Sequence, residues 1–153
     1  MNIYSLQFVA LLMWLSVFVG AYQRIFDIPK WFANPPVSFE FLRKQGKGLA
    51  FFWIPLSVLS VAAFASSLFL NYMQPVVLNY MLASIACFTL AKTLSAVYFT
   101  REIVAFAKTP VTAPKTPSLV IRVKFWMRWT ILRDALQVMA ALLITVAKAS
   151  ANA

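Results

Sequence analysis

Two stretches of this chain are longer than twenty residues and contain no charged side chain. They are residues 1–23 and 49–91, and residues 135–147 form a third, shorter block. A helix needs about 20 mostly apolar residues to cross the roughly 30 Å hydrocarbon core of a bilayer. The sequence therefore predicts one integral membrane domain over residues 1–153, an all-α four-helix bundle of up-down topology. The expected spans are approximately 3–24, 49–70, 76–100 and 120–147.

The overall composition supports a membrane protein. Hydrophobic residues make up 62% of the chain and charged residues only 12%, which is too apolar for a soluble domain of this length. The first stretch lacks the basic start and the cleavage site of a secretory signal peptide, so we expect it to remain as the first helix. Histidine is absent, which argues against haem, zinc and histidine-dependent hydrolytic sites. We therefore expect no metal and no cofactor.

The basic residues gather in the two long connections, after the first and the third span. Ten of the 14 Lys and Arg residues lie there, whereas Lys148 is the only one in the C-terminal tail. Because Lys and Arg concentrate on the cytoplasmic side of membranes, we expect both proline-rich loops in the cytoplasm and both termini outside, in a bacterial inner membrane. Anionic lipid headgroups then account for the net charge of +10, and a nucleic-acid partner is not expected.

The first connection combines aromatic and charged residues. Trp31, Phe32, Phe39 and Phe41 lie between its charges, a mixture typical of segments in the headgroup layer. An interfacial or re-entrant helix is expected near residues 37–44. The second connection, rich in proline, is predicted to be an extended linker.

Two further patterns concern how the spans pack. A short turn before Pro75 predicts a tight antiparallel hairpin of the second and third spans. Ser84, Cys87, Ala91 and Ser95 recur at helical spacing, as expected for a seam between helices, with a transport path as the alternative. Each half of the chain also reads helix, basic loop, helix, which hints at two parallel repeats, although residue identity does not support them.

The fourth span carries charges inside an apolar sequence. Trp126, Thr130, Arg133 and Gln137 follow one another at spacings of four, three and four, so they share one helical face. A charge near the centre of a spanning helix costs about 2.5 to 3.5 kcal/mol on the insertion scale. This face is therefore predicted to point into the bundle.

Lys92 interrupts the third span at a matching depth. It precedes Arg101 by nine residues, and Arg133 follows Lys124 by nine, so each lies roughly 13 Å from the expected cytoplasmic end. Lys92, Arg133 and Asp134 are thus expected in one layer. Asp134 is the natural partner of Lys92, or else of Arg133.

Two cations and one carboxylate would leave this layer with an excess positive charge. A neutral Lys92, Asp27 reaching in from the first helix, or an anionic ligand would each balance it. A purely structural network that fixes the third span against the fourth is equally compatible with the sequence.

These residues are the candidates for function. The expected ligand-binding residues are Lys92, Arg133, Asp134, Trp126 and Thr130. A second polar layer nearer the cytoplasm is expected from Gln23, Arg24, Asp27, Glu102 and Arg128. Within it, Arg24 with Asp27 and Arg101 with Glu102 are expected to form interfacial pairs. Trp126 either lines a pocket or anchors the helix at the interface, Trp129 is expected to anchor, and no catalytic residue is assigned.

Some of these features resemble a known family. Four spans of this length, a GAY…P turn from Gly20 to Pro29, and a fourth helix entered through W-x-x-W-x-x-x-R at Trp126, Trp129 and Arg133 resemble the anthrone oxygenase-like family of small four-helix membrane proteins. The resemblance implies oxidation of polycyclic phenolic substrates without metal or flavin, although many members have no assigned activity.

Two functions therefore remain open, and whether the protein is an enzyme is undecided. In one, it binds a lipophilic phenolic or anionic small molecule at the Lys92, Arg133 and Asp134 layer and is a candidate to oxidise it. In the other, it is a non-catalytic scaffold or an accessory subunit that contacts a membrane protein partner. A concave space beside Lys92 would favour the first function, and a layer filled by side chains would favour the second.

Overall fold

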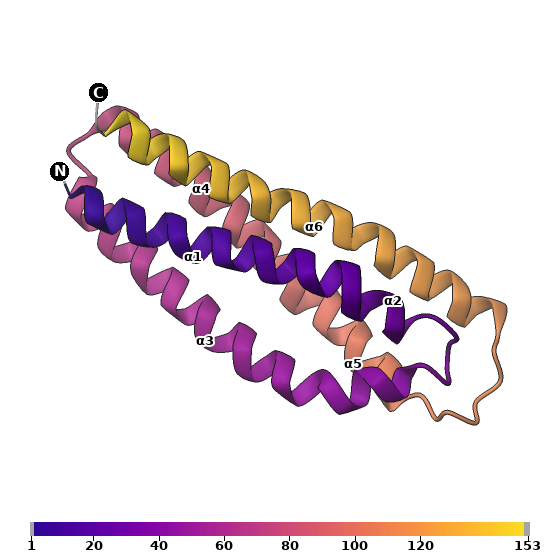
Figure 1. Cartoon of the computed structure of the whole chain (residues 1–153). Coiled ribbons are helices and arrows are strands. Elements are labelled where there is room, and N and C mark those ends of the chain that lie inside the picture. Colours follow the sequence, from indigo (N-terminus) through magenta and orange to yellow (C-terminus); the bar gives the residue numbers. More distant parts are fainter. Residues whose placement is uncertain (1, 152–153) are drawn as a thin grey trace.

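The computed structural model describes residues 2–151, except for the side chain of Lys47. Four helical rods lie side by side in it, and these residues contain no strand. All four rods are long and apolar enough to cross a membrane: Ile3–Trp31, Gly48–Asn71, Pro75–Lys108 and Pro117–Ser150. Both chain termini lie at one end, called here the terminal end, and both long connections lie at the other, the loop end (Figure 1). The predicted all-α, four-span architecture is confirmed.

The first and third rods are built alike. The first consists of α1 (Ile3–Tyr22), the π-helical turn η1 (Gln23–Asp27) and α2 (Ile28–Trp31). The third consists of α4 (Pro75–Leu94), the π-helical turn η2 (Ser95–Phe99) and α5 (Thr100–Lys108). In both rods an α-helix of 20 residues is followed by a π-helical turn of five. The two halves suggested by the sequence therefore share a structural feature, and π-turns of this kind are frequent at functional sites.

The second and fourth rods are long uninterrupted helices, α3 (Phe39–Asn71, 33 residues) and α6 (Pro117–Ser150, 34 residues). Thr116 caps α6 by accepting a hydrogen bond from the Leu119 N–H, and Pro117 occupies the first turn, where its missing N–H costs nothing. At 1.5 Å per residue each helix is about 50 Å long, well beyond the roughly 30 Å of hydrocarbon. These rods therefore extend past the bilayer core.

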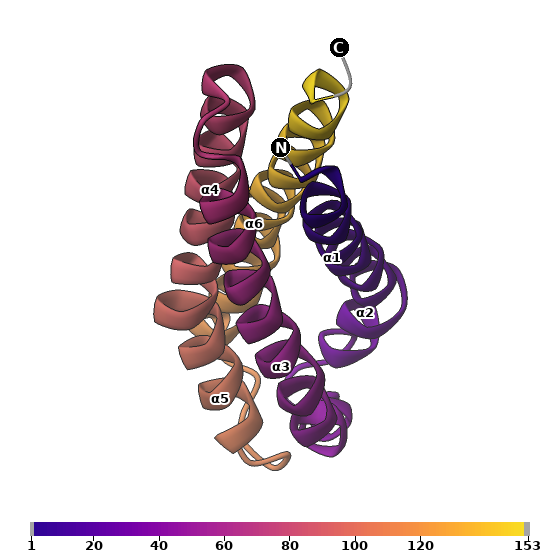
Figure 2. The same cartoon turned by 90° about the vertical axis from the view of Figure 1, so that its left-hand side faces the viewer.

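A first apolar core lies toward the terminal end. α6 packs closely on both α4 and α1, whereas α3 lies on the opposite side of the bundle (Figure 2). Ala140 and Ala147 of α6 are completely buried, and the buried Ser84 hydroxyl donates to the Ala140 carbonyl at 2.8 Å. Small residues here allow two backbones to approach closely. The seam predicted through Ser84 and Ala91 is confirmed.

A second apolar core lies at the loop end and corrects the expectation for the first connection. Trp31, Phe32 and Phe39 are buried there together with Phe106 and Trp126, whereas Phe41 is exposed. Their rings pack edge to face or tilted, at centroid distances such as 5.5 Å for Phe32 and Phe106. These aromatic side chains pack on one another in the interior of the bundle and are not arranged along its surface.

The expected interfacial helix is likewise absent from the described residues. The segment 39–44 forms the first turns of α3 and continues into the span without a break. Residues 109–116 contain no helix, in agreement with the predicted linker.

The second and third rods form a looser hairpin than predicted. Their turn is short, but α3 and α4 pack much less closely than α4 and α6. Bulky side chains fill the space between them, and the rings of Phe64 and Phe88 meet at a centroid distance of 5.5 Å. Pro55 lies inside α3, where it removes one backbone hydrogen bond, and α3 curves away from α1 in its middle (Figure 1).

Candidate functional site

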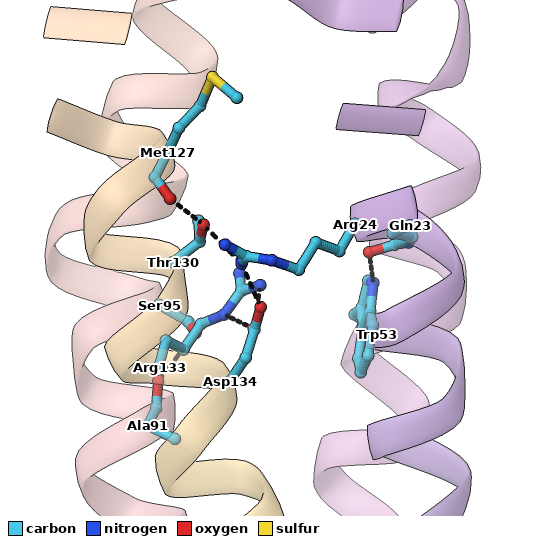
Figure 3. Close-up of polar contacts among 9 residues, drawn as sticks. All are labelled: Gln23, Arg24, Trp53, Ala91, Ser95, Met127, Thr130, Arg133 and Asp134. Atoms are coloured by element: carbon cyan, nitrogen blue, oxygen red, sulfur yellow. Dashed lines mark hydrogen bonds and ion pairs between the residues drawn. The ribbon is translucent and has the colours of Figure 1, made fainter. Parts of the chain in front are cut away.

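Asp134 of α6 is the centre of the charged cluster. Its Oδ2 accepts a hydrogen bond from Arg24 Nη1 at 2.7 Å, and its Oδ1 accepts from Arg133 Nη2 at 2.7 Å and Nε at 3.0 Å (Figure 3). The side chains are 35%, 23% and 27% exposed for Arg24, Arg133 and Asp134. Both carboxylate oxygens are thus occupied by guanidinium groups at half-buried positions. Sequence reasoning placed Arg24 in the second polar layer, but it belongs to this one.

The first rod brings Arg24 to α6 through its π-turn. The residue lies in η1, and besides Asp134 its Nη1 donates to Thr130 Oγ1 at 3.0 Å. Thr130 is buried and donates its own proton to the Met127 carbonyl at 2.7 Å. Thr130 therefore orients the guanidinium, and the network ties the first rod to the fourth.

Lys92 does not form the expected pair with Asp134. Within residues 2–151 the structure gives its Nζ no ion pair and no hydrogen bond. Instead, Nζ lies 5.2 Å from the centroid of the Trp53 ring and 5.3 Å from that of Phe88, at cation–π distances. The physical reason is direction: α4 turns Lys92 toward Trp53 of α3, while Arg24 reaches the carboxylate from η1.

The matched depth of Lys92 and Arg133 is nevertheless found. Figure 3 draws Ala91 and Ser95 of the third rod at the level of Arg133, and α4 packs closely on α6. The Arg133 guanidinium also lies 5.1 Å from the ring centroid of Phe99, one turn further along that rod. Residue counting predicted the common depth of Lys92 and Arg133, but it did not predict which neighbouring helix Lys92 faces.

Trp53 links the second rod to this level. Its Nε1 donates to Gln23 Oε1 at 3.3 Å, and its ring covers Lys92. All four rods therefore contribute a polar side chain at one depth. Trp53 was not among the residues predicted from the sequence. Its distance of 18 residues from Asn71, the end of the second span, is a signal from which its depth could have been counted.

We call Arg24, Lys92, Arg133 and Asp134 the charged layer. Three cations and one carboxylate give it a net charge of +2. Asp27, which the sequence offered as a second acid, forms no ion pair among the described residues. The excess is thus larger than the sequence alone indicated, since Arg24 joins the layer without a second acid.

The remaining polar residues pair differently from the expectation. Arg24 contacts Asp134 and not Asp27, and Glu102 accepts from Arg122 Nη2 at 2.9 Å and not from Arg101. The Arg122 guanidinium also lies 5.4 Å from the Phe106 ring centroid. This pair joins α5 to α6 at the loop end, outside the charged layer.

The two tryptophans of α6 have different surroundings. Trp126 is buried, its Nε1 donates to the Phe99 carbonyl at 3.4 Å, and its ring packs on Phe32 and Phe99. It fills the second core and lines neither of the two depressions described below. Trp129 is 39% exposed, which suits an interface anchor.

The two best-defined depressions of the described chain lie away from the charged layer. One, of about 350 Å³, is lined by Ala50, Phe51, Ile54 and Pro55 on α3. The other, of about 270 Å³, is lined by Arg128, Trp129 and Leu132 on α6. Both open widely to the surface. The described residues also contain no group of three side chains suited to hold a metal ion.

Comparisons of the chain with models of protein families, with curated proteins and with solved structures gave no match. These comparisons identify no family, so only the four long apolar helices of the suggested resemblance remain. The chain is a small multi-pass membrane protein with four apolar helices.

Proposed function

We propose that this protein binds a lipophilic anionic molecule at the charged layer. The observation that carries the proposal is the charge balance: Arg24 and Arg133 both pair with Asp134, and no second acid pairs with Lys92 among the described residues. An unpaired charge held among apolar spans is costly, and a bound anion removes that cost. The Nζ of Lys92 has no acceptor among the described residues, so we propose that Lys92 binds the anion.

Each residue has a distinct part in this proposal. Arg24 and Arg133 are held by Asp134, and Thr130 fixes Arg24 further, so these donors are preorganised. Lys92 supplies the charge, while the rings of Trp53 and Phe88 offer apolar surface beside it. The loop end is proposed to face the cytoplasm, because nine Lys and Arg residues, four in residues 30–47 and five in residues 101–124, lie on its helix ends and connections.

Oxidation of a bound phenolic molecule is the narrower form of this proposal. Arg133 and Lys92 would stabilise a phenolate or enolate by charge. A polycyclic substrate would also need a space beside Lys92, and the two best-defined depressions lie elsewhere. The two depressions therefore lend no support to oxidation of a polycyclic substrate, and the proposal of binding rests on the charge balance of the layer.

A second candidate function is that of a non-catalytic scaffold or accessory subunit. It is favoured by the way Arg24, Asp134 and Arg133 satisfy one another and join the first rod to the fourth. In this case the layer stabilises the bundle and a partner subunit docks elsewhere.

Native mass spectrometry of the gently extracted protein separates the two functions. The proposal expects a retained small molecule in the wild type, its loss in Lys92→Gln, and its retention in Lys124→Gln, an exposed lysine on α6 used as control. A retained protein subunit without a small molecule supports the scaffold. A small molecule retained equally by Lys92→Gln contradicts binding at this layer.

A further inference from the structure

The exposed tyrosines of the first rod mark where the bilayer core begins and ends. Tyr4 is 81% exposed and Tyr22 is 58% exposed, and 18 residues of helix place them about 27 Å apart. That separation is close to the roughly 30 Å of a hydrocarbon core, and tyrosines gather at its two boundaries. Trp129, 21 residues or about 31 Å from the end of α6 at Ser150, lies at the same loop-side boundary as Tyr22.

Helix lengths place the charged layer at the level of Tyr22, near the loop-side boundary that this spacing indicates. Arg24 follows Tyr22 by two residues. Lys92 is 17 residues from Pro75, about 25 Å along the helix, and Asp134 is 16 residues from Ser150, about 24 Å. This is the depth at which lipid headgroups meet their acyl chains. An anion at this depth is supplied at high local concentration by the membrane itself.

Lys92 also faces the seam through which a lipid can reach it. Its ammonium lies between α4 and α3, against the rings of Phe88 and Trp53, and these two helices pack loosely. Contact with the faces of two rings leaves its N–H donors free for oxygen acceptors. The same rings give an acyl chain an apolar surface beside the charge.

Neither of the two depressions described above is lined by Lys92, and a lipid ligand does not require one there. A small molecule taken from water needs a concave space that buries most of its surface. A lipid keeps its acyl chains in the bilayer and places only its headgroup against the protein. A ligand of this kind needs a cation at the right depth and no enclosed cavity.

We infer that the ligand of the charged layer is the anionic phosphate headgroup of a lipid from the loop-side leaflet, bound by Lys92 at the seam between α3 and α4. This inference rests on the proposed function and names its ligand class. The phosphate oxygens accept from the Lys92 ammonium, and the excess positive charge of Arg24 and Arg133 favours a lipid with a net negative charge over a zwitterionic one.

Thermal melting of the purified protein in a neutral detergent tests the inference. Three probes are added in turn: a phosphatidylglycerol, a phosphatidylcholine with the same acyl chains, and glycerol phosphate without chains. We expect the phosphatidylglycerol to raise the melting temperature of the wild type. The phosphatidylcholine and the glycerol phosphate should leave that temperature nearly unchanged. Equal stabilisation by both lipids would overturn the role of the anionic headgroup. Stabilisation by glycerol phosphate would overturn the membrane as its source.

Variants locate the site. Lys92→Gln should weaken the apparent affinity for the anionic lipid about tenfold, the loss of one charge-assisted hydrogen bond, whereas Lys92→Arg and Lys124→Gln should keep it. Unchanged affinity in Lys92→Gln would overturn the inference. If Lys92→Gln does not fold, the comparison of probes on the wild type still decides.

Failure of the inference and failure of the proposed function give different results. If no lipid stabilises the protein but mass spectrometry finds another anionic molecule that depends on Lys92, the inference falls and the proposed function stands. If neither method finds a ligand at Lys92, both fall.

Discussion

Breaking the contact between Arg24 and Asp134 should destabilise the bundle measurably. Asp134→Asn removes the carboxylate that holds two guanidinium groups through hydrogen bonds of 2.7 Å. Both arginines then keep their charge at half-buried positions without a counterion. Arg24→Gln removes one of the two and leaves Arg133 to neutralise the acid.

The size of the effect follows from burial. Hydrogen bonds to charged groups contribute about 1.5–3 kcal/mol, and breaking a fully buried pair costs about 3–5 kcal/mol. The side chains of Arg24 and Asp134 are 35% and 27% exposed, so solvent screening reduces these values. We expect a coupling free energy of about 1–2 kcal/mol between the two positions, with Asp134→Asn the more harmful single change.

A double-mutant cycle measures this coupling. Reversible unfolding in mixed detergent gives the free energy of unfolding of the wild type, the two single variants and the double variant. The pair Glu40 and Lys44, four residues apart with side chains 57% and 72% exposed, serves as control and should couple by no more than about 0.5 kcal/mol. Additive effects of Arg24→Gln and Asp134→Asn would refute the assigned contact.

A second cycle, with Lys92→Gln and Asp134→Asn, distinguishes the structure from the expectation drawn from sequence. Because Lys92 lies on the rings of Trp53 and Phe88, its loss and that of the carboxylate should be nearly additive. A coupling as large as that of Arg24 with Asp134 would show that Lys92 pairs with the acid after all.

Three further changes test the packing. Asn71→Ala removes a buried amide that bonds Ser67 and the start of α1, and should lower the free energy of unfolding by about 1–3 kcal/mol; an unchanged value would contradict this contact. Ala140→Leu should lower the free energy of unfolding by about 1–3 kcal/mol through overpacking. Leu142→Ala on the exposed face should lower it far less, and equal losses of free energy would contradict the packing of α6 on α4 at Ala140. Trp126→Ala should cost about 3–5 kcal/mol, and Trp129→Ala, as the exposed control, should cost clearly less in the same denaturation assay.

Hydropathy was sufficient to predict the four spans and their terminal ends. The predicted and observed first residues agree at Ile3, and Pro75 begins α4 where the turn was expected. The loop ends were predicted too short, because Trp31 and Phe39 in a charged context were assigned to the headgroup layer. Their burial depends on a partner, Phe106, that lies far away in the sequence.

The candidate site could be predicted in depth but not in direction. Counting residues was enough to bring Lys92 and Arg133 to one level, since every residue of a helix adds about 1.5 Å. Which neighbour each side chain faces depends on the rotation of the rods and on the π-turn that carries Arg24. The periodicity of the sequence shows neither the rotation of the rods nor the π-turn. For this reason Arg24 was assigned to the wrong layer and Trp53 was not predicted.

Fluorescence quenching of Trp53 reports whether the charged layer attracts an anionic lipid to the α3–α4 seam. Lipids brominated near the headgroup, either anionic or zwitterionic, are compared at equal mole fraction, and Trp53→Phe isolates the contribution of this residue from the other four tryptophans. The account predicts stronger quenching of Trp53 by the anionic lipid, and equal quenching by both lipids in Lys92→Gln. Equal quenching of Trp53 by both lipids in the wild type would contradict it.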